Sequence, residues 1–159
     1  MKRAIFAGTF DPVTVGHEEM IEKASALFDE LVVALCFNPE KKAMFSREQR
    51  LEMLKKTCSP YKNVTVVCHE GLLVDLMRSE NINVNVRGIR NSTDLKYENE
   101  MSYFNSRLMP DILTVYIPCG LGTSLISSSA IRELILLGQP VDGYVPEGCA
   151  ELIKKYRKQ

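Results

Sequence analysis

Five short apolar segments, separated by stretches of helical periodicity, constrain the fold of this chain more than any other feature. The segments are rich in apolar residues and are bounded by polar or turn residues, as β-strands are. Their apolar residues are continuous rather than alternating, which is typical of strands that helices cover on both faces of a parallel sheet. The five segments span residues 3–7, 31–37, 64–68, 82–86 and 112–117.

The stretches between these segments carry apolar residues at the spacing of amphipathic helices. Ser46 and Gln49 form a capping box that predicts the start of the second helix. The other helical patterns centre on residues 20–28, 72–77, 95–108, 131–137 and a basic stretch at 150–158. The length of 159 residues is about that of one domain. We therefore predict a single three-layer α/β/α Rossmann-like domain over the whole chain, with a five-stranded parallel sheet.

The charge balance argues against several classes of protein. Twenty Lys and Arg residues oppose twenty Asp and Glu residues, so no net field favours nucleic acid or an anionic membrane. The uncharged stretch 112–131 contains Pro118 and two glycines, which makes it too broken for a bilayer span, and no secretory h-region follows Met1. Five cysteines without a CxxC pair favour reduced thiols. We expect a cytoplasmic protein with neither a nucleic-acid nor a membrane partner.

Functional residues of a doubly wound sheet gather beyond the carboxyl ends of its strands. The first strand is followed by a loop with Gly8 and Gly16, and the next helix is expected to open near Gly16, just before His17. A helix N-terminus offers unpaired N–H groups and a positive dipole end, so an anion is expected there. The Gly-Lys-Ser/Thr of a P-loop and the GxGxxG of a dinucleotide site are both absent from this loop. A lone histidine more often caps a helix or packs against other side chains than binds a ligand. A functional role for His17 therefore depends on the groups that accompany it.

Three other strand ends carry groups that suit phosphate. Lys41 and Lys42 follow the second strand, Arg87 and Arg90 the fourth, and a run of serines at 127–129 precedes the fifth helix. Taken singly, the lysine pair is more often a solvated surface pair and the serine run an ordinary helix cap. Four such elements at four strand ends of a neutral chain together predict a cleft that binds phosphates.

Two stretches of the chain resemble the motifs of a known superfamily. Residues 8–17 read Gly-Thr-Phe-Asp-Pro-Val-Thr-Val-Gly-His, and residues 126–132 read Ile-Ser-Ser-Ser-Ala-Ile-Arg. They are similar to the (H/T)xGH and ISSxxxR motifs of the nucleotidyltransferase superfamily. More narrowly, segments 38–45, 87–90 and 94–98 resemble the bacterial phosphopantetheine adenylyltransferase family, in order and in spacing.

This resemblance implies transfer of AMP from ATP to 4′-phosphopantetheine, which gives dephospho-CoA and pyrophosphate in coenzyme A biosynthesis. The acceptor phosphate is already a nucleophile, so direct in-line attack needs positioning and charge stabilisation but no covalent enzyme intermediate. The family resemblance also implies Mg²⁺ bound mainly through the ATP phosphates, no tight protein metal site, and a homo-oligomer, by resemblance a hexamer.

The resemblance also assigns roles to residues. His17, Lys41 and Arg90 would be catalytic, with His17 donating to the α-phosphate of ATP as negative charge develops. The acceptor would be bound by Thr9, Lys41, Leu73 and Arg87. ATP would be bound by Thr9, Phe10, His17, Gly88, Ile89, Arg90, Glu98, Thr123, Ser124, Leu125, Ile126, Ser127, Ser128 and Ser129.

Two other functions remain open at this point. The chain could be a related transferase that acts on nicotinate mononucleotide, or one that uses CTP on a small phosphorylated alcohol, although such relatives generally show HxGH where Thr14 stands here. It could also be a regulatory module that binds ATP without turnover. Tyr103, Phe104 and Met109, at the end of the fourth helix, could belong to the core or to a subunit contact.

Overall fold

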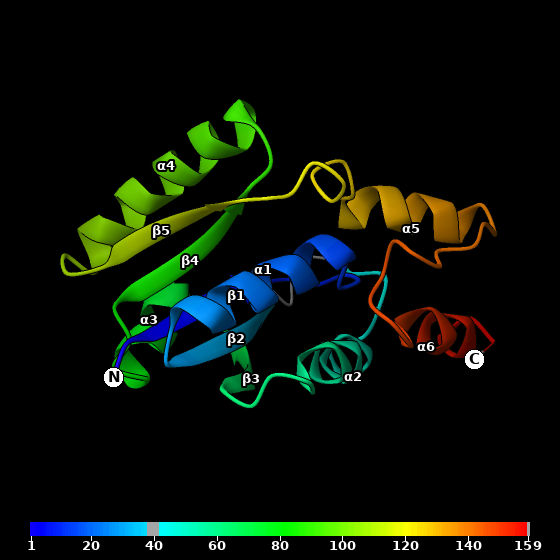
Figure 1. The fold of residues 1–159 in the computed structure, drawn as a ribbon, viewed down its shortest axis with the longest axis horizontal. Coiled ribbons are helices and arrows are strands. Elements are labelled where there is room, and N and C mark those ends of the chain that lie inside the picture. Colours follow the sequence, from blue (N-terminus) through cyan, green and yellow to red (C-terminus); the bar gives the residue numbers. More distant parts are fainter. Residues whose placement is uncertain (38–41, 159) are drawn as a thin grey trace.

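The computed structural model of the chain describes residues 1–37 and 42–158 (Figure 1). In this part of the chain, five strands form one parallel sheet in the order β3-β2-β1-β4-β5, which confirms the predicted fold class. The strands are β1 (Arg3–Gly8), β2 (Glu30–Phe37), β3 (Val64–Glu70), β4 (Val84–Ile89) and β5 (Leu113–Pro118).

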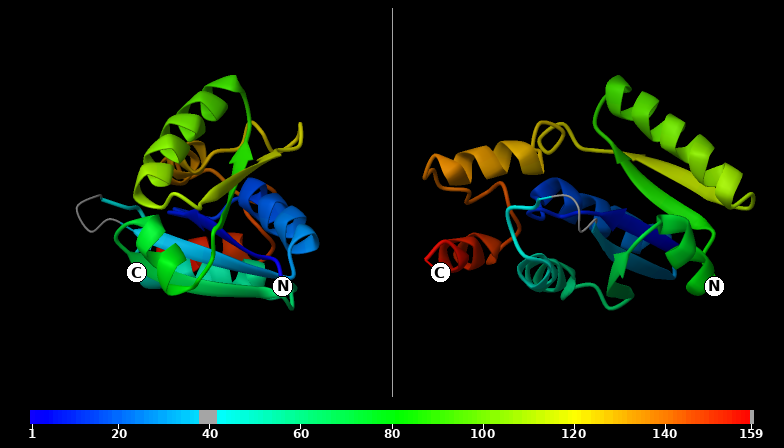
Figure 2. Two further views of the ribbon diagram at one scale, coloured as in Figure 1. Left: turned by 90° about the vertical axis from the view of Figure 1, so that its left-hand side faces the viewer. Right: turned by 180° about the vertical axis from the view of Figure 1, so that it is seen from behind.

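Helices cover both faces of the sheet and its carboxyl edge. They are α1 (Val15–Leu27), α2 (Arg47–Cys58), α3 (Leu73–Ser79), α4 (Ser92–Leu108), α5 (Ser128–Leu136) and α6 (Cys149–Tyr156). Helices α1 and α2 pack on one face of the sheet, and α3 packs on the other. Helices α5 and α6 lie beyond the carboxyl ends of the strands, in orange and red in Figures 1 and 2. None of the helices in the described residues is long and apolar enough to cross a bilayer.

The core is divided by the sheet, as the apolar runs of the strands predict. In β1, Ala4 and Phe6 join the cluster formed with α1 and α2, whereas Ile5 and Ala7 join the cluster formed with α3. The middle of β2 is buried on both sides in the same way. A strand in this position needs apolar residues at successive positions, because neither of its faces meets water.

The predicted capping box of α2 is present. Ser46 accepts a hydrogen bond from the Gln49 backbone, and the Gln49 side chain accepts one from the Ser46 backbone. Gly138 follows the last turn of α5 and has a positive φ of +73°, the left-handed conformation that commonly ends a helix.

The fourth strand is shifted from the prediction. It begins at Val84 rather than at residue 82 and runs to Ile89, so that Arg87 and Gly88 lie inside the strand rather than after it. The reason is pairing with β5, in which Arg87 is registered with Tyr116 and Gly88 with Ile117. Gly88 also has no room for a side chain, because an added Cβ would lie 2.9 Å from Met20.

Helix α4 differs most from what its sequence pattern suggests. None of its 17 residues is buried, and Tyr103 and Phe104 are 61% and 59% exposed. The sequence left open whether these aromatic residues and Met109 belong to the core or to a subunit contact. Only Met109, which follows the helix, is buried in the core. Figure 2 shows α4 as an outlying ridge above the edge strand β5.

Candidate active site

The strand order places a topological switch point between β1 and β4, and doubly wound sheets form a crevice above such a point. From β1 the chain continues to β2 on one side, and from β4 it continues to β5 on the other, so the connections diverge above these two neighbouring strands. The β1–α1 loop, the β4–α4 turn and the β5–α5 loop meet at this edge, and in Figures 1 and 2 the first turns of α1 and α5 lie side by side. This is the position where doubly wound sheets bind ligands.

His17 stands in the first turn of α1 and uses one ring nitrogen to cap the helix. Its Nδ1 accepts a hydrogen bond of 3.0 Å from the backbone N–H of Thr14, while the Thr14 hydroxyl accepts one of 3.2 Å from the His17 backbone. A backbone amide can only donate, so Nδ1 is unprotonated and the proton of the neutral ring is on Nε2. The capping role and a donor role therefore fall on different nitrogens of one ring.

The surroundings of His17 keep this ring neutral. It is half-buried, and its edge packs on Phe10 with the ring centroids 4.9 Å apart. Burial, followed by the positive charges of Arg87 and Arg90, lowers the pKa of His17 to about 4. At neutral pH, His17 is thus an uncharged N–H donor placed beside two guanidinium groups.

Phe10 itself takes an unusual backbone conformation. Its φ of +45° lies in the left-handed region that most side chains avoid, yet its ring is 1% exposed. The ring lies over Gly8, where an added Cβ would come within 3.1 Å of it. Burial of the phenyl ring and the absence of a side chain at Gly8 together hold the loop against the base of the crevice.

Arg87 is held by three hydrogen bonds. Its Nε and Nη2 donate to the two carboxylate oxygens of Glu98 on α4, at 2.8 and 2.6 Å, and its Nη1 donates to the Ala7 carbonyl at 2.8 Å. This bidentate arrangement fixes the guanidinium plane above the end of β1. Glu98 is thereby the partner of Arg87 in this structure.

Arg90 follows β4 directly and is bound to Asp94 in the first turn of α4. Its Nε and Nη2 donate to the Asp94 carboxylate at 2.8 and 3.1 Å, and these hydrogen bonds lower the pKa of Asp94. The Arg90 side chain is 38% exposed, so the pair lies at the surface of the crevice. An exposed pair of this kind is weak enough for a phosphate to compete with it.

Asp11 ties the β1–α1 loop to two other segments. Its buried carboxylate accepts hydrogen bonds from the backbone N–H groups of Met44 and Phe45, at 2.9 and 3.0 Å. Its carbonyl accepts a bond of 2.6 Å from Arg132 on α5. A single residue thus joins three segments that come from different parts of the chain.

The serine run begins α5 next to the same loop. Ser127 caps the helix by accepting a hydrogen bond from the Ala130 N–H, and the Ser128 hydroxyl donates to the Pro12 carbonyl at 2.8 Å. The first turns of α1 and α5 therefore converge, and each has the positive dipole end that favours an anion.

Comparison with known proteins agrees with this geometry. Residues 5–134 match the Cytidylyltransferase-like family model. A phosphopantetheine adenylyltransferase of Clostridium kluyveri is 40% identical over 159 residues, which cover 99% of this chain and 97% of that protein. The chain belongs to the phosphopantetheine adenylyltransferase family. A member from Clostridium botulinum is 39% identical over 98% of this chain and 94% of its own length.

Membership of the phosphopantetheine adenylyltransferase family makes this protein a nucleotidyltransferase, as the TxGH and ISSxxxR motifs predict. A crystal structure from Vibrio parahaemolyticus, provisionally named a nicotinate-nucleotide adenylyltransferase, superposes with a TM-score of 0.76 over all of this chain and 98% of that one. Its sequence identity is 20%, so this likeness shows the shared fold alone.

Most of the residues predicted to bind substrates lie around the crevice of this adenylyltransferase. The structure brings His17, Phe10, Arg87 and Arg90 together, with segment 123–129 beside them. Thr9 is exposed at the end of β1, and its carbonyl accepts a hydrogen bond from Arg50. Leu73 begins α3 and is half-buried against the second core cluster. Lys41 lies outside the described residues.

Sequence reasoning missed the residues that hold these groups in place. The motifs assign no role to Asp11, although it lies within residues 8–17, and they indicate neither Glu19 nor Arg132 as an anchor of the loops. A buried acidic residue inside a strand-end motif was the available signal for Asp11. Nothing in the local pattern indicates that Glu19 anchors a loop, because its partners in that loop lie about a hundred residues further along the chain.

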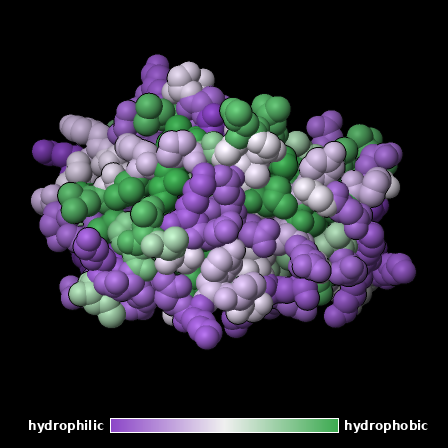
Figure 3. All heavy atoms as spheres, in the orientation of Figure 1, coloured by the Kyte–Doolittle hydropathy of each residue, from purple (hydrophilic) through white to green (hydrophobic). Residues whose placement is uncertain are grey.

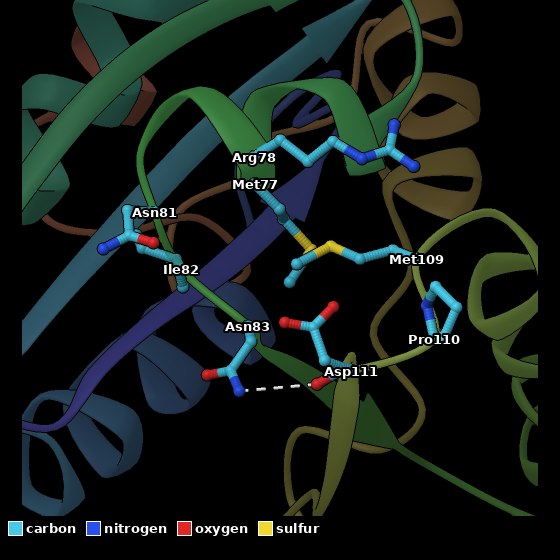
Figure 4. Close-up of a pocket in the computed structure, with 8 residues that line it drawn as sticks. All are labelled: Met77, Arg78, Asn81, Ile82, Asn83, Met109, Pro110 and Asp111. Carbon is cyan, nitrogen blue, oxygen red and sulfur yellow. Dashed lines mark hydrogen bonds between the residues drawn. The ribbon is translucent and has the colours of Figure 1, made fainter.

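The cavity drawn in Figure 4 is separate from this crevice. It lies at the amino ends of β4 and β5 and has a volume of about 490 Å³. None of the predicted site residues lines it. Its lining consists of Met77, Arg78, Asn81, Ile82, Asn83, Met109, Pro110 and Asp111.

The described residues contain no group of three or more His, Cys, Asp and Glu side chains that could hold a metal ion. Near the crevice, the carboxylates of Asp11 and Glu98 are engaged by backbone N–H groups and by Arg87 respectively. The donor set at this edge is therefore one of N–H groups and hydroxyls, which suits phosphate oxygens better than a bare cation.

Proposed function

We propose that this adenylyltransferase transfers AMP from ATP to 4′-phosphopantetheine and releases pyrophosphate. An oxygen of the acceptor phosphate attacks the α-phosphorus of ATP, the bond to the oxygen bridging to the β-phosphorus breaks, and dephospho-CoA forms. The relatives of 39–40% identity are named phosphopantetheine adenylyltransferases, and this name supports the substrate pair. The observation that carries the mechanism is the neutral His17 ring, with its Nε2 proton, at the first turn of α1.

His17 acts on the charge that develops at the α-phosphate. A neutral ring with a pKa of about 4 gives a hydrogen bond without having to lose a proton, and it needs no reorganisation when the transition state forms. The capping bond at Nδ1 fixes the direction of the ring before substrate arrives. This arrangement explains how the family chemistry proceeds without a nucleophilic side chain.

ATP binds through its phosphates to Arg90 and to the first turn of α5. Among the described residues, the hydrogen bonds of Arg90 use its backbone N, Nε and Nη2, and Nη1 makes none. A triphosphate can therefore bond Nη1 directly or displace Asp94 from the fork. The dipole end of α5 and the hydroxyl protons of Ser127 and Ser129 face the same anion, whereas Ser128 holds this end of the helix against the Pro12 carbonyl. Gly88 and Ile89 supply the neighbouring backbone, and Phe10 the floor.

The acceptor binds next to Arg87. The guanidinium group of Arg87 is oriented by Glu98 and supplies a fixed positive charge above β1. Leu73 offers apolar surface at the start of α3. Thr9 lies at the end of the same strand, and the ammonium group of Lys41 would complete the set. Lys41→Ala is expected to raise the KM for the acceptor, and an unchanged acceptor dependence would contradict this role.

Mg²⁺ would be bound together with the nucleotide. It would be held mainly by the oxygens of the triphosphate and by water, which is its usual state in sites that handle ATP. When bound there, it neutralises part of the charge on the pyrophosphate leaving group. The residues of the crevice then have to position the two phosphorylated substrates and to stabilise the remaining charge.

The protein assembles as a homo-oligomer, a hexamer by family resemblance, through the region of α4 and β5. The exposed side chains of α4 include Tyr97, Tyr103 and Phe104, and Leu113 at the start of β5 is 59% exposed. Figure 3 shows hydrophobic residues gathered over the part of the surface where Figure 1 places β4 and β5. A patch of this kind favours contact with another protein surface over contact with water. Sedimentation equilibrium measures the assembly, and a monomer at micromolar concentration would refute it.

A pyrophosphate-release assay tests the reaction. ATP is offered with 4′-phosphopantetheine, nicotinate mononucleotide or glycerol phosphate, and CTP replaces ATP in a parallel series. The proposal requires turnover only with ATP and 4′-phosphopantetheine. Turnover with another pair would assign a different transferase reaction, and binding of ATP without pyrophosphate release would indicate a regulatory module.

A further inference from the structure

We propose that Glu19 is a positioning residue that fixes the β5–α5 loop, residues 119–127, in the conformation that binds the nucleotide. This inference rests on the proposed function, because it concerns the residues that would meet ATP. Glu19 itself touches no substrate in this proposal. It acts through the loop, whose end carries the serines of α5.

One face of α1 is directed at the loop. Gly16, Glu19 and Lys23 are spaced at i, i+3 and i+7, which places them along the same side of the helix. His17 lies on a different side, since residues one or two apart on a helix do not share a face. Helix α1 therefore presents its catalytic group and its loop-binding groups in different directions.

The carboxylate of Glu19 is the centre of the contact. Its Oε1 accepts a hydrogen bond of 2.8 Å from the Gly120 backbone N–H, and its Oε2 accepts one from the Thr123 hydroxyl. The carboxylate also forms an ion pair with Lys23 one turn further along α1. Burial alone would raise the pKa of Glu19, but the bonds from Lys23, Thr123 and Gly120 outweigh it and lower the pKa. Glu19 thus acts as an ionised acceptor, which forms stronger hydrogen bonds than a neutral one.

The contacts continue at both ends of the loop. At the end of β5, Lys23 donates to the Pro118 carbonyl at 2.9 Å. At the first turn of α1, the Thr123 carbonyl lies 3.6 Å from the position that a Cβ of Gly16 would take. Along this face, Lys23 and Glu19 bind the loop, and Gly16 lies close to the part of the loop nearest the crevice, where phosphate would bind.

Polar contacts hold the middle of this loop, because its two leucines are exposed and only its ends, at Cys119 and Ile126, pack against the core. Leu121 and Leu125 are 95% and 89% exposed, so hydrophobic burial contributes little at these positions. Gly120 accepts backbone bonds from Thr123 and Ser124, and a Cβ at Gly120 would come within 2.9 Å of the Glu19 carboxylate. A glycine at this position allows the backbone to approach the acid closely enough for the hydrogen bond.

Loss of the carboxylate should therefore weaken ATP binding specifically. Glu19→Ala removes two hydrogen bonds to a charged group, so the loop has to be ordered when ATP arrives rather than before. We expect the KM for ATP to rise about 10- to 100-fold, with little change in the KM for the acceptor. Glu19→Gln keeps an amide oxygen for the Gly120 N–H and should restore most of the ATP affinity. Glu22→Ala, one turn along on the exposed side of α1, is the matched control and should behave as the parent protein.

Hydrogen–deuterium exchange of the substrate-free protein gives an independent readout. In Glu19→Ala, exchange should become faster in residues 119–127 while α2 and β2 keep their protection. If that variant fails to fold, loop exchange in substrate-free Thr123→Val decides, since this variant removes one of the two hydrogen bonds to Glu19. A KM for ATP in Glu19→Ala within twofold of the parent value, or unchanged loop exchange in the variant that folds, would overturn the proposal. If the parent protein released no pyrophosphate, the proposed function would fail, but loop exchange and ATP binding by calorimetry would still test Glu19.

Discussion

Replacing His17 separates the catalytic role proposed for it from its role in helix capping. His17→Ala removes the Nε2 donor that we propose for the α-phosphate, and loss of one preorganised donor of this type costs about 2.7 to 4 kcal/mol of transition-state stabilisation. This corresponds to a fall in kcat of about 10²- to 10³-fold. The variant also loses the bond from Thr14 to Nδ1, which contributes about 1 kcal/mol to stability as helix caps do. For a chain of this length, the unfolding temperature should fall by only about 2–4 °C.

His17→Glu gives the sharper comparison. Glutamate three residues after a capping threonine is the usual partner in a capping box, and its negative charge would lie at a helix N-terminus near Arg87 and Arg90. We expect this variant to unfold within a few degrees of the parent. Its activity should be lower than that of His17→Ala, because a carboxylate donates no hydrogen bond and repels phosphate. Pyrophosphate release and thermal unfolding by circular dichroism provide the two measurements. A kcat for His17→Ala within threefold of the parent would remove this residue from the mechanism.

Three further predictions concern protonation and stability. In the substrate-free protein, nitrogen NMR of a His69→Gln variant, which leaves one histidine, should show the His17 ring neutral and protonated on Nε2 down to about pH 5. The pKa of His17 in the folded protein lies below its value in the unfolded chain. The neutral ring therefore contributes stability that is present above pH 6.5 and is lost as the pH falls toward 4. Titration of His17 near pH 6.5 would contradict this. Asp11→Asn should lower the free energy of unfolding by about 2 kcal/mol and the unfolding temperature by about 4–8 °C. The reason is that the backbone N–H of Met44 or Phe45 would then face the N–H of the new side-chain amide. Equal stability would refute the anchoring role. Asn85→Leu should raise stability by about 1–2 kcal/mol in urea unfolding, because the buried Asn85 Oδ1 accepts no hydrogen bond from the described residues; destabilisation would show that the amide is satisfied in solution.

Local interactions account for the parts of the fold that the sequence predicts well. The apolar runs specify strands buried on two faces, and the Ser46 and Gln49 pair specifies the start of α2 through bonds three residues apart. Such features need no knowledge of neighbouring elements. The end of β4 was harder to predict, because the partner strand β5 extends pairing through Arg87 and Gly88.

The exposure of α4 could not be deduced from its composition. Its aromatic and aliphatic residues follow the same spacing as those of a core helix, but the helix lies over the edge of the sheet, where no other described element covers its outer side. The periodicity of a sequence indicates that a helix has an apolar face, but it does not indicate what that face packs against. The tertiary arrangement decides between a core and an interface.

Local patterns predict the succession of strands and helices along the chain, the family, and the groups that suit phosphate, since each depends on residues close together in sequence. How those groups are held follows from the fold: Asp11 reaches backbone 33 and 34 residues away, and Glu19 reaches the loop 101 to 104 residues away. These contacts follow from the order of the strands in the sheet, which brings the β1–α1 and β5–α5 loops to one edge. A hydrogen bond between them has no local signature, because neither partner alters the periodicity or capping of its own segment.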